Sequence, residues 1–327
     1  MKKRIGMFLA AAMAAMCAFA APMVSDVVAK QRYPWNGLVD ITCKVSGFSG
    51  TAKWELAVDA VMPDSGKVRK VSQFWVVKNG VKSTDKKVQA NGTYKLLWDA
   101  QADLGAVVHS NMVMRVNVVE FHDKVQLWEG GPYWATTNIG AEKPEEYGYY
   151  FWWGDTIGYK RKNNAWVASD GSSSNFSFDS SNTPTYGKSM TTLKSKGWIT
   201  ADEILAPVHD AAHVHWGGNW RMPTKQELDD LNSKCDWSWT TINGVYGYRV
   251  RGKGDYSSNS IFLPCAGYGY EASLCSAGSY GGYCSSVPYS DYSYYAWHLY
   301  FHSGGYYTYY DDRYFGQSVR PVQVFSE

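Results

Sequence analysis

Three histidines lie close together in the segment PVHDAAHVHWGG (207–218), and imidazole is a common ligand for zinc and copper. His209 and His213 would share one face of a helix, whereas His213 and His215 would share one face of a strand. Neither pairing has a carboxylate or a cysteine at ligand spacing to complete a metal site. We therefore predict no metal site and no cofactor.

Cysteine thiols are the second candidates for chemistry, because they can pair, bind metals or act as nucleophiles. Beyond the N-terminal segment the chain has Cys43, Cys235, Cys265, Cys275 and Cys284, and their spacing fits no C-x-x-C zinc pattern. An odd number leaves one thiol unpaired or paired with another chain. The pairing of the last four cysteines stays open, and Cys43 is predicted to be a buried strand residue.

The segment 283–315 has an unusual composition. Its 33 residues hold 11 of the chain's 25 tyrosines and contain no Lys, Glu, Gln, Asn or Met. Exposed surface is ordinarily rich in Lys and Glu. Tyrosine gives large, rigid contact area at a low cost in conformational entropy, so binding surfaces favour it. The composition predicts a protein that binds a ligand, not an enzyme.

Alternation in this segment predicts two strands. Trp297, Leu299 and Phe301 would fall on a core face, with His298, Tyr300 and His302 on an exposed face. Gly304 and Gly305 can turn the chain, so that 306–310 returns as a second strand.

Residue types in the segment also share a pattern in the genetic code. Tyr, Ser, Asp and His are each one adenine substitution from an Asn codon and Phe is two, whereas Lys, Glu, Gln, Met and Trp cannot be reached by changing the adenines of AAC or AAT. The outward or loop positions, which we predict to bind the ligand, are Tyr289, Ser290, Asp291, Tyr292, Ser293, Tyr294, Tyr295, His298, Tyr300, His302, Tyr306, Tyr307, Tyr309, Tyr310, Asp311, Asp312, Tyr314 and Phe315. Cys275 and Cys284 also fit Asn-codon products.

This pattern resembles the variable region of a diversity-generating retroelement target protein. In such systems a reverse transcriptase miscopies template adenines and rewrites the end of a C-type-lectin-like gene. The resemblance implies a diversified binding surface over 283–315, closed by the unvaried stretch GQSVRPV (316–322). The alternative is a tyrosine-rich β surface that arose by ordinary drift or serves self-association.

The chain forms two predicted domains, and the segment 283–315 lies in the second. Short alternating stretches between turn signals predict a small β-sandwich over 21–122, with strands at 39–45, 52–61, 73–77, 93–98 and 111–119. WDAQADLG (98–105) and SNMVMRVNVV (110–119) resemble immunoglobulin-like modules that precede sulfatase-modifying-factor-type domains in exported bacterial proteins. The second domain spans 125–327, with a polar surface loop predicted at 159–197 and one helix at 225–234. Thr224 and Glu227 form a capping box for that helix.

Five stretches of the second domain resemble one known family. They are LWEGGPYWATTNIGAEKPEEYGYYFWWGDT (127–156), WGGNWRMPTKQEL (216–228), CDWSWT (235–240), SIFLPCAG (260–267) and GQSVRPV (316–322). Together they resemble the Fibrobacter succinogenes major paralogous domain, a C-type-lectin-like fold distantly related to formylglycine-generating enzymes. The resemblance implies an α+β domain with a small sheet, one or two helices and terminal strands that lie close together. Arg221 and Arg320 would be structural network residues.

Two other functions remain as alternatives. Formylglycine generation would use Cys275 and Cys284 as its cysteine pair, but both lie in or beside the segment that looks variable. The Glu-Pro-Asn, Gln-Pro-Asp and Trp-Asn-Asp motifs of calcium-dependent lectins are absent. A fixed-specificity adhesin or glycan-binding surface protein, which would stack sugars on Tyr and Trp, stays open.

The N-terminus predicts export. Lys2, Lys3 and Arg4 precede an apolar stretch at 5–16 that is too short to span a bilayer, and Ala18-Phe19-Ala20 is a cleavage site, so 1–20 is a signal peptide. The protein would then be periplasmic, on the cell surface or secreted, and not membrane-spanning. A net charge of +2 gives no electrostatic case for nucleic acid. The expected partner is a protein or glycan ligand on another cell or phage surface.

Overall fold

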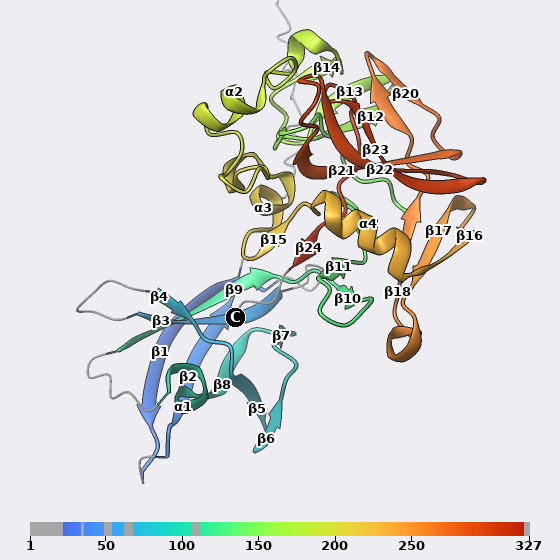
Figure 1. The fold of residues 1–327 in the computed structure, drawn as a ribbon. Coiled ribbons are helices and arrows are strands. Elements are labelled where there is room, and N and C mark those ends of the chain that lie inside the picture. Colours follow the sequence, from blue (N-terminus) through green and yellow to red (C-terminus); the bar gives the residue numbers. More distant parts are fainter. Residues whose placement is uncertain (1–21, 34–35, 49–53, 62–67, 106–111, 324–327) are drawn as a thin grey trace, which may run out of the picture. The chain divides into compact units, whose positions relative to one another are not determined.

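The computed structural model describes residues 22–33, 36–48, 54–61, 68–105 and 112–323, so the predicted signal peptide 1–20 lies outside the described residues. The chain divides into two compact units, Met1–Phe121 and His122–Glu327 (Figure 1). Both units are rich in β-strands, as the sequence predicts for the first domain, whereas an α+β fold was the expectation for the second.

The first unit contains two antiparallel sheets. One has the strand order β1 (Met23–Gln31), β2 (Leu38–Ser46), β8 (Gly92–Asp99), β5 (Phe74–Lys78) and β6 (Val81–Ser83). The other joins β4 (Val68–Lys70), β3 (Trp54–Val61) and β7 (Lys87–Val88), and β9 (Val113–Glu120) also pairs with β3. A short helix, α1 (Ala100–Leu104), follows β8.

One apolar core fills the first unit. On β2, buried Ile41, Cys43 and Val45 alternate with the more exposed Thr42 and Lys44, because successive strand side chains point to opposite faces. Buried residues from strands of both sheets belong to the same cluster. The predicted strands correspond to β2, β3, β5, β8 and β9, and the predicted burial of Cys43 is confirmed.

The described strands of the second unit form five small sheets. They are β10 (Lys124–Gln126) with β11 (Tyr133–Ala135), β24 (Val322–Gln323) and β15 (Trp220–Arg221); β12 (Tyr159–Lys162), β13 (Ala165–Ala168) and β14 (Ser174–Phe176); β16 (Asp236–Ile242), β17 (Val245–Arg251) and β18 (Ser260–Pro264); β19 (Tyr268–Tyr270) and β20 (Ser273–Cys275); and β21 (Tyr280–Pro288), β22 (Tyr295–His302) and β23 (Gly305–Asp312). Its α-helices are α2 (Met190–Ser195), α3 (Ala211–Trp216) and α4 (Lys225–Lys234). The two ends of the second unit meet in one sheet, since β11 pairs with β24. The expectation of close terminal strands is therefore confirmed.

The segment 159–197 is not the surface loop that its polar composition predicted. It contains β12, β13, β14 and α2, with Ser180–Asn182 forming a 3-10 turn. Trp166 and Phe178 are fully buried and their rings meet edge to face at 4.9 Å. A few aromatic side chains can anchor a chain whose remaining residues are polar, since each buries a large area.

The predicted capping box begins α4. The Thr224 hydroxyl accepts a hydrogen bond from the Glu227 amide at 3.2 Å, and a Glu227 carboxylate oxygen accepts one from the Thr224 amide at 2.8 Å. Arg221 donates two hydrogen bonds to the same carboxylate, at 2.6 and 2.7 Å. These contacts fix the first turn of the helix.

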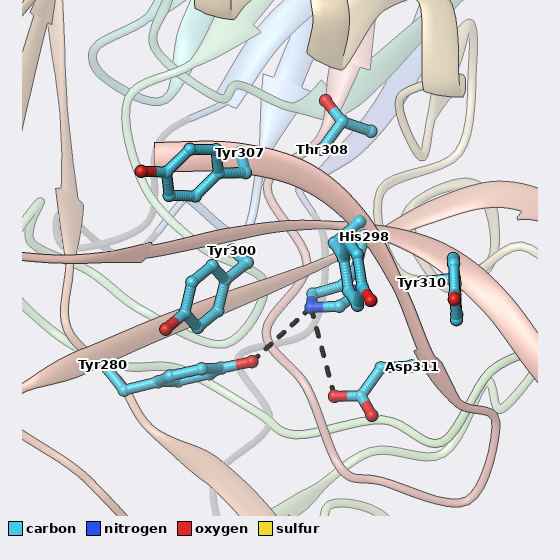
Figure 2. Close-up of a pocket in the computed structure, with 8 residues that line it drawn as sticks. Tyr280, His298, Tyr300, Tyr307, Thr308, Tyr310 and Asp311 are labelled. Carbon is cyan, nitrogen blue, oxygen red and sulfur yellow. Dashed lines mark hydrogen bonds and ion pairs between the residues drawn. The ribbon is translucent and has the colours of Figure 1, made fainter. Parts of the chain in front are cut away.

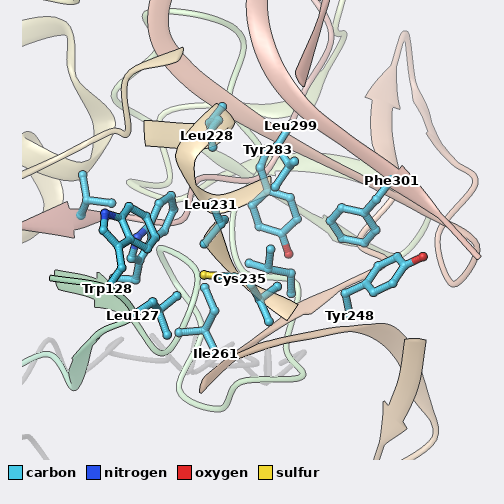
Figure 3. Packing of buried hydrophobic residues seen from close by; sticks show 14 of the residues in the cluster. Leu127, Trp128, Leu228, Leu231, Cys235, Tyr248, Ile261, Tyr283, Leu299 and Phe301 are labelled. Carbon is cyan, nitrogen blue, oxygen red and sulfur yellow. The ribbon is translucent and has the colours of Figure 1, made fainter. Parts of the chain in front are cut away.

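Helix α4 covers one face of the sheet formed by β21, β22 and β23. Leu228 and Leu231 of α4 belong to the same buried cluster as Tyr283, Leu299 and Phe301 of the sheet (Figure 3). The predicted core positions Leu299 and Phe301 are confirmed. Since α4 occupies this face, the opposite face of the sheet is where a ligand could bind. In the part of the chain that the structure describes, no helix combines the length and apolar composition that crossing a bilayer requires.

Candidate functional site

The register of β21, β22 and β23 places His302 and six pocket-lining polar or aromatic side chains on the sheet face opposite α4. His298 pairs with Tyr309 and Tyr300 pairs with Tyr307, and residues directly opposite in an antiparallel pair share a face. Period-two alternation adds the remaining members. The six that line the pocket are Tyr280, His298, Tyr300, Tyr307, Tyr309 and Asp311.

These six side chains surround an open pocket of about 550 Å³, which Thr308 and Tyr310 also line. Figure 2 shows the Tyr280 ring lying across the sheet with its hydroxyl directed at His298. Gly282 makes this position available, because a Cβ there would come within 2.9 Å of the Tyr280 ring. The Tyr280 and Tyr300 ring centroids are 5.0 Å apart, and Tyr300 and Tyr307 stack at 6.2 Å.

The structure places twelve of the eighteen predicted ligand-binding residues in three groups, and the remaining six are Ser290, Asp291, Ser293, His302, Tyr306 and Asp312. The pocket takes His298, Tyr300, Tyr307, Tyr309 and Asp311, and Tyr310 also lines it. A second aromatic group joins Tyr289, Tyr292, Tyr295 and Tyr310, with Tyr289 and Tyr310 only 4.3 Å apart. A third includes Tyr294, Tyr314 and Phe315, where Tyr186 lies about equally close to Tyr294 and Tyr314. The groups are in contact, because Tyr310 stacks on Tyr309 at 4.5 Å and Tyr268 lies between Tyr280 and Phe315.

Exposure separates these residues further. Ser290, Asp291, Tyr292, Tyr294, Tyr307 and Tyr309 are exposed, whereas Tyr289, Ser293, Tyr295, Tyr300, His302, Tyr306, Tyr310, Asp311, Asp312, Tyr314 and Phe315 are half-buried. The exposed tyrosines are all about half accessible, which leaves ring surface free for a partner.

His298 contradicts the prediction of an outward-facing residue, because it is only 3% exposed. It does lie on the same sheet face as Tyr300, but it sits at the floor of the pocket. Its Nε2 atom is 3.5 Å from the Tyr280 hydroxyl and 4.0 Å from the Asp311 Oδ2 atom. Alternation correctly predicts that His298 lies on the same sheet face as Tyr300. It does not show that His298 is buried there.

Tyr306 is a second correction. It pairs with Phe301, so it lies on the α4 side of the sheet, where it packs against the buried cluster. Its ring stacks on Trp237 with centroids 4.3 Å apart. Tyr306 is a core-side residue and not part of the pocket.

Tyr280 was missed by the sequence analysis, since it precedes the segment 283–315. A usable signal was the alternation of Tyr280, Gly282 and Cys284, which continues the pocket face of β21. Tyr186, in the third aromatic group, lies about a hundred residues earlier and left no such signal.

Burial keeps the two titratable groups at the pocket floor uncharged. Desolvation lowers the pKa of His298 to about 3, although the backbone of Tyr309 partly offsets the effect. Desolvation also raises the pKa of Asp311 to about 7, while the hydrogen bond from the Asp312 amide lowers it. His298 and Asp311 are therefore neutral neighbours at pH 6, not an ion pair.

Replacing Asp311 with Asn should stabilise the protein at pH 8. The folded carboxyl keeps its proton up to about pH 7, whereas the unfolded one loses it near 3.8, so its contribution to stability is present below pH 3.8 and is lost as the pH rises through 7. We expect Asp311→Asn to gain about 1–3 kcal/mol in the free energy of unfolding at pH 8 and little at pH 5. Urea denaturation at both pH values measures this. The exposed Asp236→Asn serves as control, and a loss of stability in Asp311→Asn at pH 8 would contradict the assignment.

The histidines and cysteines weighed as chemical centres have other contacts. His209 stacks on Trp198 at 3.9 Å, and the His215 Nε2 atom lies 3.0 Å from the Thr156 carbonyl oxygen. Among the described residues there is no group of three His, Cys, Asp or Glu side chains that could hold a metal ion. The five described cysteines are all free, and burial raises the pKa of the Cys284 thiol well above its usual range.

Comparison with known proteins gives one similarity. A family described as a domain of unknown function (DUF8237) matches residues 224–322. The match begins at the N-cap of α4 and ends in β24, so it includes α4, the pocket sheet and every predicted ligand-binding residue. No curated protein and no solved structure matches the chain.

Proposed function

We propose that this chain is an exported binding protein that displays a diversified, tyrosine-rich surface on a rigid scaffold. The observation that carries the proposal is the pocket face of β21, β22 and β23. It presents four tyrosines around an open pocket while α4 holds the other face in a packed core. A binding surface needs both parts, since side chains on a fixed backbone lose less entropy when they bind.

The scaffold in this proposal is a C-type-lectin-like domain of the major paralogous type, preceded by an immunoglobulin-like module. The paired terminal strands and the two-sheet core of the first unit are consistent with these resemblances. The ligand would be a protein or glycan on another cell or phage surface, and the protein would be periplasmic, surface-exposed or secreted.

Binding is favoured over formylglycine generation by the state of Cys284, and over histidine-based catalysis by the state of His298. Cys284, which formylglycine chemistry would need as a thiolate, is a buried thiol with a raised pKa. His298 is a weak base, since its pKa is lowered to about 3. Neither group is prepared for nucleophilic or general-base catalysis near neutral pH.

The experiment that tests the proposal is to sequence the 3′ end of this gene, with its flanking DNA, across a population of the source organism. We expect substitutions at the codons of exposed positions such as Tyr292, Tyr307 and Tyr309, matched to adenines of a nearby template copy. Codons for Leu299 and Phe301 should stay constant. An invariant 3′ end without a template would overturn diversification and favour the fixed-specificity adhesin or glycan-binding protein.

A further inference from the structure

Asp311 is a carboxyl group at the floor of an aromatic pocket, and no Lys or Arg among the described residues pairs with it. Its oxygens accept hydrogen bonds from the Asp312 amide at 2.9 Å and from the Gln317 Nε2 atom at 3.3 Å. Its side chain keeps 25% of its surface accessible. The nearest basic group is His298, which stays neutral. A carboxylate in this position lacks a counter-ion.

The pocket walls favour a positive charge. Tyr280, Tyr300, Tyr307 and Tyr309 line the same pocket as Asp311, and the faces of aromatic rings carry negative potential. No lysine or arginine lines the pocket. The segment 283–315 contains three Asp, one Arg and no Lys or Glu, so its charge is 1 − 3 = −2.

From this geometry we infer that the pocket binds an organic ammonium group, with the tyrosine rings around the cation and Asp311 as its counter-ion. This inference rests on the proposed function, because it names the ligand class of the same site. A quaternary ammonium suits such a pocket, since it is attracted to ring faces and does not demand hydrogen bonds. The space of about 550 Å³ leaves room on its open side for the rest of a larger ligand.

Binding should strengthen as the pH rises from 6 to 8, because Asp311 must be ionised to act as the counter-ion. The other titratable groups that act on or face Asp311 are Tyr268, Tyr280, Cys284, His298, Asp312 and Tyr314. The Tyr and Cys pKa values are raised and that of His298 is lowered, so these groups keep one charge state across this range. Asp312 also has a raised pKa, but it follows Asp311 on the strand and is oriented toward Tyr186 and Tyr314.

The test is a calorimetric titration of the purified protein with choline and with its uncharged isostere 3,3-dimethylbutan-1-ol, at constant ionic strength and pH 8. We expect choline to bind at least about tenfold more tightly than the isostere. Asp311→Asn should abolish this preference, Tyr300→Ala should weaken both ligands, and Tyr246→Ala, an exposed tyrosine outside the pocket, should change neither. Titrations with phosphocholine and with N-acetyl-trimethyllysine amide then compare the two possible sources of the cation. Tighter binding of phosphocholine indicates a choline headgroup, and tighter binding of the lysine derivative indicates a methylated protein.

Equal affinity for choline and its isostere would overturn the inference, as would unchanged choline binding in a folded Asp311→Asn variant. Binding of methyl glycosides without binding of choline would assign the pocket to neutral sugars. These results are separate from the sequencing test. A diversified gene with no choline binding would leave the proposed function and remove the ligand class, whereas choline binding with an invariant gene would show a fixed-specificity site.

Discussion

A library that replaces the exposed codons of Tyr292, Tyr294, Tyr307 and Tyr309 with AAC-derived codons is expected to yield mostly folded clones. Each of these side chains is about half exposed. Substitutions at such positions change the free energy of unfolding by about 0.5 kcal/mol or less when no special contact is lost. Most clones should therefore resist protease on a display platform and melt within a few degrees of the parent protein.

The matched control is a library of equal size at Leu299, Phe301 and Arg313. Leu299 and Phe301 lie in β22 and Arg313 directly follows β23, and all three are buried. Loss of a buried apolar side chain costs about 2–5 kcal/mol, so most clones of this library should be degraded. The two libraries differ in burial and not in codon type. Equal survival would show that the pocket sheet is not held by its α4 face, and equal failure would show that the tyrosines are structural.

Much of the scaffold could be predicted because its signals are local. The strand β2 follows from alternation, and α4 follows from Thr224, Glu227 and its apolar stripe. The core positions Leu299 and Phe301 follow from the same period-two argument. These patterns need only neighbouring residues, so a single sequence contains them.

The candidate site was predicted less well because its geometry depends on distant segments. Alternation put His298 beside Tyr300, but nothing in 283–315 shows that Tyr280 covers it. The segment alone does not show that Tyr306 faces the core, because the partner that stacks on it, Trp237, lies in another sheet. The polar segment 159–197 forms strands because Trp166 and Phe178 bury there, which composition averages conceal.

Arg313 limits how far the segment can vary, and its replacement should have the largest effect on stability. It is 1% exposed and donates hydrogen bonds to three backbone carbonyls, those of Tyr295 at 2.9 Å, Thr185 at 2.8 Å and Lys188 at 2.9 Å. Its guanidinium lies 4.9 Å from the Trp153 ring centroid. Burial lowers its pKa to about 10, so it remains charged at neutral pH.

We expect Arg313→Ala to lower the free energy of unfolding by about 3–5 kcal/mol, because it removes hydrogen bonds to three backbone carbonyls and opens a cavity where the side chain was buried. Arg313→Lys should recover little, since an ammonium cannot reach three carbonyls with the geometry of a planar guanidinium. Urea denaturation measures both, with the exposed Arg249→Ala as control. If Arg313→Ala stayed within about 1 kcal/mol of the parent, the anchor would be unnecessary. If the loss is as large as expected, natural variants must keep this arginine, so Arg313 should stay constant while the neighbouring tyrosines vary.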